Sequence, residues 1–237
     1  MENNKFTERY RHELKYFISY ISTWEYQSLA KIFADTMQVD PNCNENGEYW
    51  IRSLYFDTLE NDDLYEKVCG NYRRKKIRLR IYAEDQQDAK IEIKNRIEQY
   101  VFKESATLSR PDALELIAGN KEVLLKYNDS TLNNVYYYMA QDLYRPAVIV
   151  DYDREAFIGP SDDIRITFDK NIRGSSINFD LYNKHITTLQ AFDEETVVLE
   201  VKFKEFLPDW IREILKFRQA ERFAISKYYF TRILHYR

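Results

Sequence analysis

The chain has 237 residues with a formal net charge of −4 at pH 7, and 44% of its residues are hydrophobic. This length suits one sizeable core, so we expect a single domain over residues 1–237. The negative balance argues against a nucleic-acid coat, which usually carries a basic patch on a basic domain. No apolar run approaches the roughly 18 residues that cross a bilayer, and the polar N-terminus lacks a signal peptide's apolar centre. We therefore expect a cytoplasmic protein without a membrane segment.

The first predicted strand, residues 11–16, alternates charged and less polar side chains. Because successive strand side chains point to opposite faces, Arg11, Glu13 and Lys15 share one face. A capping box and apolar residues at helical spacing then predict a helix over residues 22–37.

The next predicted elements are a strand over residues 50–57 and a helical or irregular stretch over residues 60–67. A polar turn at residues 86–89 makes residues 76–97 a predicted hairpin. Its first strand places Arg78 and Arg80 on one face, opposite isoleucine and leucine.

A helix start at Ser109, with proline and an acid in its first turn, leads into two predicted helices over residues 111–142. A terminal helical region is predicted from Pro208 onward. Between these regions the pattern predicts strands at residues 147–154, 164–169, 177–181, 187–191 and 196–204. Strands interleaved with helices, without room for long parallel crossovers, indicate an α+β protein built around an antiparallel barrel.

The polar faces of five predicted strands carry mainly lysine and arginine with a few glutamates. One interpretation is an ordinary antiparallel sheet with paired charges on its wet face. The other is a closed barrel whose lining brings the cations together and whose apolar faces pack outward against helices. Such a lining suits a polyanion, because arginines bind phosphates by charge-assisted hydrogen bonds. The glutamates could hold a divalent metal on phosphate oxygens.

Familiar site motifs do not account for this pattern. The sequence contains no Walker lysine loop, dinucleotide-binding glycine motif, zinc-protease helix or paired Cys-x-x-Cys. The 5 glycines argue against a glycine-rich phosphate loop, which leaves a site built from side chains. Cys43 and Cys69 form no metal motif or disulfide framework, and we interpret the three histidines as structural.

A set of short motifs in this order resembles the catalytic domain of the vacuolar transporter chaperone (VTC) polyphosphate polymerases, within the triphosphate tunnel metalloenzyme (CYTH-like) superfamily. The resemblance covers nearly the whole chain. Its motifs are Arg11-His12-Glu13-Leu14-Lys15-Tyr16, Ser53-Leu54-Tyr55-Phe56-Asp57, Lys76-Ile77-Arg78-Leu79-Arg80, Glu92-Ile93-Lys94, Tyr152-Asp153-Arg154, Arg165-Ile166-Thr167-Phe168-Asp169, Leu199-Glu200-Val201-Lys202, Pro208-Asp209-Trp210 and Ser226-Lys227-Tyr228.

The resemblance implies a closed antiparallel β-barrel tunnel of about eight strands with flanking helices. In it, ATP would donate its γ-phosphoryl group to inorganic polyphosphate with a divalent metal, Mn²⁺ or Mg²⁺. The implied catalytic residues are Lys15, Arg78, Arg80, Lys94 and Lys227. The implied phosphate-binding residues are these five together with Arg154, Arg165, Lys202 and Ser226. Glu200 matches the metal-binding carboxylate, and Glu13 and Glu92 are further candidate metal ligands.

Two other functions remain open at this point. The same tunnel with water as acceptor would be a tripolyphosphatase or nucleoside triphosphatase. A non-catalytic module that binds polyphosphate or nucleotide would keep the cations without turnover. Arg11 stands where the superfamily's usual motif has a carboxylate, which favours the polymerase branch over a plain triphosphatase.

Overall fold

The computed structural model describes residues 12–18, 23–98, 100–159, 163–192, 196–217, 221–222 and 225–234. Its strands are β1 (His12–Ile18), β2 (Gln38–Val39), β3 (Glu48–Asp57), β4 (Arg73–Arg74), β5 (Ile77–Ile81), β6 (Asp88–Ile97), β7 (Tyr100–Ser109), β8 (Arg145–Ile158), β9 (Arg165–Ser175), β10 (Leu189–Gln190), β11 (Val197–Phe203) and β12 (Glu221–Arg222). Its helices are α2 (Thr23–Thr36), α3 (Asp62–Val68), α4 (Arg110–Ile117), the 3₁₀ helix η1 (Lys121–Lys126), α5 (Ser130–Gln141), α6 (Asp209–Phe217) and α7 (Lys227–Ile233).

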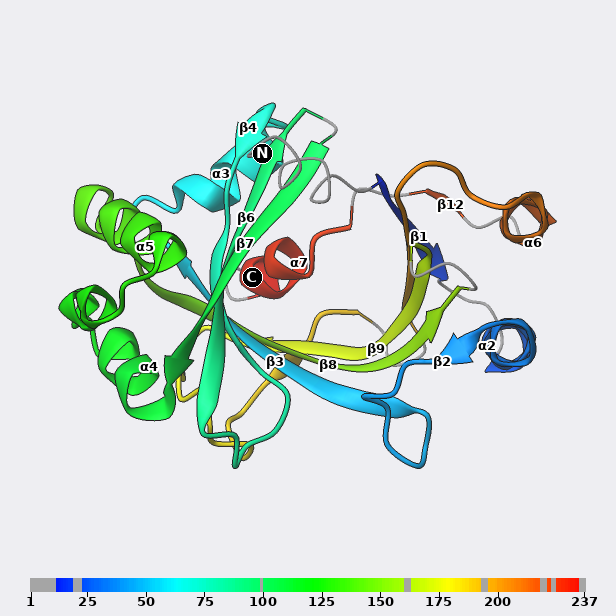
Figure 1. The fold of residues 1–237 in the computed structure, drawn as a ribbon, viewed down its shortest axis with the longest axis horizontal. Coiled ribbons are helices and arrows are strands. Elements are labelled where there is room, and N and C mark those ends of the chain that lie inside the picture. The colour runs from blue at the N-terminus through cyan, green and yellow to red at the C-terminus, as the bar shows by residue number, and fades with distance from the viewer. Residues whose placement is uncertain are drawn as a thin grey trace.

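The twelve strands of the described ranges belong to one sheet, and every described pairing is antiparallel. The long strands follow the order β1-β11-β9-β8-β3-β5-β6, with β7 also on β6. The sheet curls into a half-barrel (Figure 1). Within the described ranges no ladder joins β7 or β4 to β1 or β12. The α+β class is therefore confirmed, and closure into a barrel is not.

Helices cover the convex face of the sheet in two groups (Figure 1). The group α4, η1 and α5 packs on β5, β6 and β7, where Leu79 and Ile91 have no exposed surface. Helices α2 and α6 pack on β8, β9 and β11 around Phe33 and Phe168. The apolar side chains of β5 and β6 are therefore buried outward, as the alternation predicts, whereas β3, β8, β9 and β11 also carry apolar residues on the concave side.

Helix α7 occupies the concave side of the sheet (Figure 1). Ile225 and Tyr228 pack there in an apolar cluster with Val150, Tyr152 and other residues of β3, β8 and β9. Gly174 of β9 allows this approach, because a Cβ at that position would lie 2.7 Å from the Cβ of Thr231. The end of the chain's described region thus fills part of the concave face.

The predicted helix at residues 22–37 and the predicted strands at residues 50–57 and 196–204 are confirmed within two or three residues, whereas β8 and β9 run 4 and 6 residues beyond the ends predicted for them. Helix α4 has the expected cap, since the Ser109 hydroxyl accepts a hydrogen bond from the backbone N–H of Asp112. The prediction of a strand at residues 177–181 is wrong, and of the strand predicted at residues 187–191 only the two residues of β10 are extended. Strand β7 was not predicted. The expected cap of α2 at Ser22 lies outside the described residues, and no described helix has both the length and apolarity to cross a membrane.

Candidate functional site

The charged faces of the strands do line the concave side of the sheet. Arg78 and Arg80 alternate with Ile77 and Leu79, which belong to the outer core. Glu200 alternates in the same way with apolar residues of β11 that pack under α2 and α6. These faces are not an ordinary wet face of a sheet, since Arg80 and Glu200 are 8% and 4% exposed, although one cross-strand charge pair of the kind expected there is present between Arg78 and Glu92.

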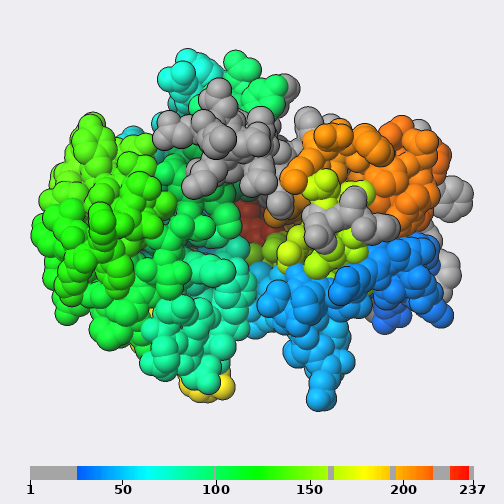
Figure 2. All heavy atoms as spheres, viewed as in Figure 1, coloured from blue at the N-terminus to red at the C-terminus, as the bar shows by residue number. Residues whose placement is uncertain are grey.

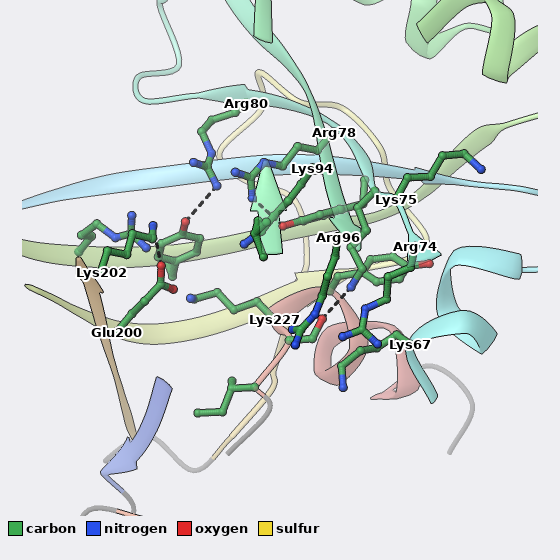
Figure 3. Close-up of a pocket in the computed structure, with 18 residues that line it drawn as sticks. Lys67, Arg74, Lys75, Arg78, Arg80, Lys94, Arg96, Glu200, Lys202 and Lys227 are labelled. Carbon is green, nitrogen blue, oxygen red and sulfur yellow. Dashed lines mark hydrogen bonds and ion pairs between the residues drawn. The ribbon is translucent and has the colours of Figure 1, made fainter. Parts of the chain in front are cut away.

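These side chains surround a cationic pocket of about 380 Å³ (Figure 3). In the space-filling view a hollow opens between the green strands and the orange and yellow ones, with α7 in red at its base (Figure 2). The lining carries six lysines and five arginines, namely Lys67, Arg74, Lys75, Lys76, Arg78, Arg80, Lys94, Arg96, Arg154, Lys202 and Lys227. Among the described side chains, Glu200 is the lone carboxylate of this lining. The pocket is strongly cationic in a chain with net charge −4.

A buried carboxylate holds the arginines of β5. Glu92 of β6 accepts a bond from Arg78 Nε at 2.6 Å and one from Lys103 Nζ at 2.7 Å, and Arg80 Nη1 lies 3.9 Å away. Burial raises the pKa of Glu92, but the charges of Arg78, Arg80 and Lys103 outweigh burial and hold this pKa well below its usual range. Glu92 therefore stays ionised and orients both arginines.

Hydroxyl groups complete the positioning of these arginines. Arg78 Nη1 donates to the Tyr55 hydroxyl at 2.9 Å. Arg80 donates to Ser53 Oγ at 3.1 Å and to the Tyr152 hydroxyl at 3.2 Å. Neutral acceptors such as these hold a guanidinium in place without cancelling its charge, which leaves the charge available to an anion.

A second buried carboxylate, Asp169 of β9, holds cations from two other elements. Arg154 of β8 donates to its two oxygens at 2.6 and 2.8 Å, and Lys227 Nζ of α7 lies 2.5 Å from Oδ2. Burial raises the pKa of Asp169, but the charges of Arg154 and then Lys227 prevail and lower it. The position of Lys227 thus depends on a residue that sequence reasoning quoted in a motif but did not place in the site.

Helix α7 is anchored so that its first turn faces the pocket. Ser226 caps the helix and accepts a hydrogen bond from Lys76 Nζ at 2.9 Å. The Tyr228 hydroxyl donates to Asp57, which is fully buried and also accepts backbone N–H bonds from α3. Asp57 therefore ties α3 and α7 together behind the pocket.

Comparison with known proteins identifies the family. A model of the VTC domain matches residues 10–234. The chain belongs to the VTC domain family. No curated protein matches this VTC domain.

Solved structures share the fold at low identity. A candidate adenylate cyclase from Bacillus halodurans is 12% identical with a TM-score of 0.54, and the match covers 92% of this VTC domain and 94% of that chain. A candidate adenylyl cyclase from Hippeastrum, described as having a dominant triphosphatase activity, is 13% identical with a TM-score of 0.55, over 94% and 95% of the chains. The fold is thus similar to that of triphosphate tunnel (CYTH-like) proteins.

The pocket of the VTC domain brings together most of the residues implied by the resemblance. These are Arg78, Arg80, Lys94, Arg154, Glu200, Lys202, Ser226 and Lys227. Arg165 does not line the pocket, because it donates to Asp40 and, at 2.9 Å, to the Tyr49 hydroxyl. Glu92 does not line it either, since it lies behind the arginines that it binds.

The side chains of Glu13 and Lys15 are outside the described atoms, but their backbone positions are described. Glu13 pairs with Lys202 and Lys15 pairs with Glu200 in the β1–β11 ladder. Directly paired residues of an antiparallel ladder share a face, so both belong to the concave side.

Sequence reasoning missed several pocket cations in the VTC domain. Lys67, Arg74, Lys75, Lys76 and Arg96 line the pocket but were not assigned a role. The run Arg73-Arg74-Lys75-Lys76, directly before the arginine strand, was the available signal. It falls on the two-residue strand β4 and its exit, which no alternation pattern can identify.

Proposed function

We propose that this VTC domain is a polyphosphate polymerase, a phosphotransferase that moves the γ-phosphoryl group of ATP onto inorganic polyphosphate. The observation that carries the proposal is the cationic pocket, where eleven lysines and arginines surround one described carboxylate in a chain of net charge −4. Concentrating cations is costly unless a polyanion neutralises them. Because this reaction needs ATP, we also infer a cytoplasmic location.

Phosphoryl transfer requires positioning and charge neutralisation more than covalent chemistry by the protein. In the proposed step, a terminal oxygen of the polyphosphate chain forms a bond to the γ-phosphorus of ATP. The bond from that phosphorus to the oxygen bridging to the β-phosphate breaks, and ADP leaves with the electron pair. The chain grows by one phosphate and no side chain acts as nucleophile.

The described cations have distinct parts in this step. Arg78, Arg80 and Arg154 have fixed guanidiniums, so they suit the equatorial oxygens of the transferred group. Lys227 lines the same pocket while Asp169 holds its ammonium, so it suits the charge that develops on the leaving oxygen. The proposed phosphate-binding set is completed by Lys15, Lys94, Lys202 and Ser226. Arg165 could bind phosphate there only if its ion pair with Asp40 broke.

The donor set fits a divalent metal that takes most of its ligands from phosphate. No cluster of three or more potential metal ligands exists among the described residues, so an all-protein metal cage is not present there. Mg²⁺ commonly binds through one or two carboxylates plus substrate phosphates, and Mn²⁺ accepts the same oxygen ligands. We propose Glu200 as that carboxylate, with Glu13 nearby by register. When bound, such an ion would neutralise phosphate charge. Glu200 is ion-paired with Lys202, whose Nζ lies 2.6 Å away, but it lines the pocket, whereas Glu92 lies outside the lining and holds three cations.

The deciding experiment incubates purified protein with ATP and Mn²⁺, or Mg²⁺, and resolves products on a polyacrylamide gel stained for polyphosphate. A ladder of long chains is the expected result. Free phosphate without chains would reassign the domain as a triphosphatase, the activity described for the Hippeastrum neighbour. If the protein makes neither polyphosphate nor free phosphate but tripolyphosphate raises its Tm, the domain is a binding module without catalytic activity.

Glu200→Gln tests the metal role. It should abolish metal-dependent turnover while leaving most of the thermal stabilisation by tripolyphosphate, because the cations remain. Glu60→Gln, at an exposed position away from the pocket, is the matched control and should keep full activity. Full activity of the Glu200→Gln protein would show that this carboxylate has no metal role.

A further inference from the structure

Arg74 and Arg96 form a like-charged pair in the cationic pocket. They are direct partners in the β4–β6 ladder, so their side chains leave the sheet on one face, and both line the pocket. Like charges placed directly opposite destabilise a sheet. Burial, and then the charge of Arg96, lowers the pKa of Arg74, against a smaller opposing effect of the Glu66 carboxylate. The pair is therefore an unfavourable arrangement for the protein alone.

Neither guanidinium of this pair donates to a carboxylate in the part of the chain that the structure describes. Arg96 Nε donates to the carbonyl oxygen of Glu98 at 2.7 Å, and Arg74 Nη1 to that of Asn71 at 3.5 Å. The motif arginines differ, because Arg78, Arg80 and Arg154 each have a buried carboxylate partner. The charge of the Arg74–Arg96 pair is thus compensated less than that of the others.

The pair also lies apart from Arg80 and from the carboxylate Glu200. In Figure 3, Lys67, Arg74 and Arg96 gather beside the start of α7, whereas Arg80, Glu200 and Lys202 lie at the opposite end of the pocket. Lys227 lies between the two groups. Lys75 points away from the pair, and its ammonium is 3.6 Å from Asp142. A ligand that contacts both ends must be an extended anion.

We propose that Arg74 and Arg96 form a second phosphate subsite, which binds the part of a polyphosphate chain beyond the length of a triphosphate. The inference rests on the proposed function in one respect, that a triphosphate group occupies the motif cations. Two adjacent guanidiniums can bind successive phosphates by paired hydrogen bonds, and the anion would relieve their mutual repulsion. The subsite would make the pocket select long chains over short ones.

The test measures binding without ATP or turnover. The affinities of tripolyphosphate and of long-chain polyphosphate are compared, at one salt concentration, for the parent protein and for R74Q/R96Q. The ratio of long-chain to tripolyphosphate affinity should fall at least about tenfold in the variant, the factor expected for loss of even one of these charge-assisted hydrogen bonds. The control R73Q/K31Q removes the same charge at exposed positions outside the pocket and should keep the ratio.

The outcomes separate this subsite from the proposed reaction. An unchanged ratio in R74Q/R96Q, or an equal loss for both ligands, would overturn the subsite. If the ratio falls but the parent protein makes no polyphosphate ladder from ATP, the subsite is correct and the polymerase is not. In a protein that does make the ladder, the same variant should release shorter chains, because it holds the growing product less tightly.

Discussion

Replacing Asp169 with asparagine should destabilise the VTC domain by about 3–5 kcal/mol, the cost of removing one partner from a buried ion pair. Asp169 has no exposed surface, and the side chains of its two partners, Arg154 and Lys227, are each 9% exposed. Both cations border the pocket, so each can recover part of its hydration by turning toward it. The amide oxygen of asparagine would still accept one hydrogen bond, so we expect the lower half of this range.

Thermal and urea unfolding measure the effect. For a chain of this size, 3–5 kcal/mol corresponds to a fall in Tm of roughly 6–20 °C. Asp153→Asn is the matched control, because Asp153 lies on the same sheet and accepts a bond from the side-chain amide of Asn171 at 2.8 Å, with no cation partner among the described residues. That control should change stability by about 1 kcal/mol or less.

Acid sensitivity provides an independent readout. The charges of Arg154 and Lys227 lower the pKa of Asp169 in the folded state. A depressed folded-state pKa contributes stability above the unfolded-state value of about 3.9, and this contribution disappears as pH falls through the folded value. The parent should therefore lose stability below about pH 4 more steeply than Asp169→Asn. A Tm within about 2 °C of the control's, or the same acid slope as the parent's, would refute the reasoning.

Two further predictions concern the surroundings of α3 and α7. Burial, followed by the charge of Asp57, raises the pKa of Asp63 to about 8, so the folded state holds a proton that the unfolded state releases above about pH 4. Stability should then decline from about pH 5 to about pH 8, and Asp63→Asn should flatten the decline in urea unfolding; an unchanged slope would contradict this. Gly174→Ala should cost about 1–3 kcal/mol and reduce stabilisation by tripolyphosphate, since its Cβ would lie 2.7 Å from Thr231 and 2.8 Å from the carbonyl oxygen of Ile149. If the Gly174→Ala protein matched the parent in both measurements, α7 would have to be free to shift.

Strand faces were predictable because the two-residue period is a local property. In β5 and β11 the sequence alone separates residues that face the pocket from residues that pack under helices. Strand β7 escaped prediction because its side chains are mostly exposed or half-buried, so the apolar half of the alternation is weak. Barrel closure depends on pairing between edge strands, which no local pattern encodes.

The site was predicted to the extent that its residues carry motifs. Arg78, Arg80, Arg154 and Lys227 were assigned through the resemblance, and they line one pocket. Glu92 was assigned as a metal ligand and not as the partner of Arg78 and Arg80. Asp169 was not assigned, because it lies 58 positions from Lys227 and only the folded sheet brings the two together. Arg165 was assigned to the site although it does not line the pocket, because its partner Asp40 precedes it by 125 positions and no local pattern shows their contact.

The location of α7 affects how the domain is made as well as what it binds. Synthesis proceeds from the N-terminus, so a growing chain can pair β3, β8 and β9 before residues 225–234 have emerged. Until then the apolar floor formed by Val148, Val150 and Val198 has no cover, and Lys227 is absent. The pocket therefore gains Lys227 at the same late stage of translation at which α7 covers this apolar surface. A chain that ends before residue 225 would expose this aggregation-prone apolar surface. We expect chaperones or proteases to bind such a chain, so it would not accumulate as a weakly active enzyme.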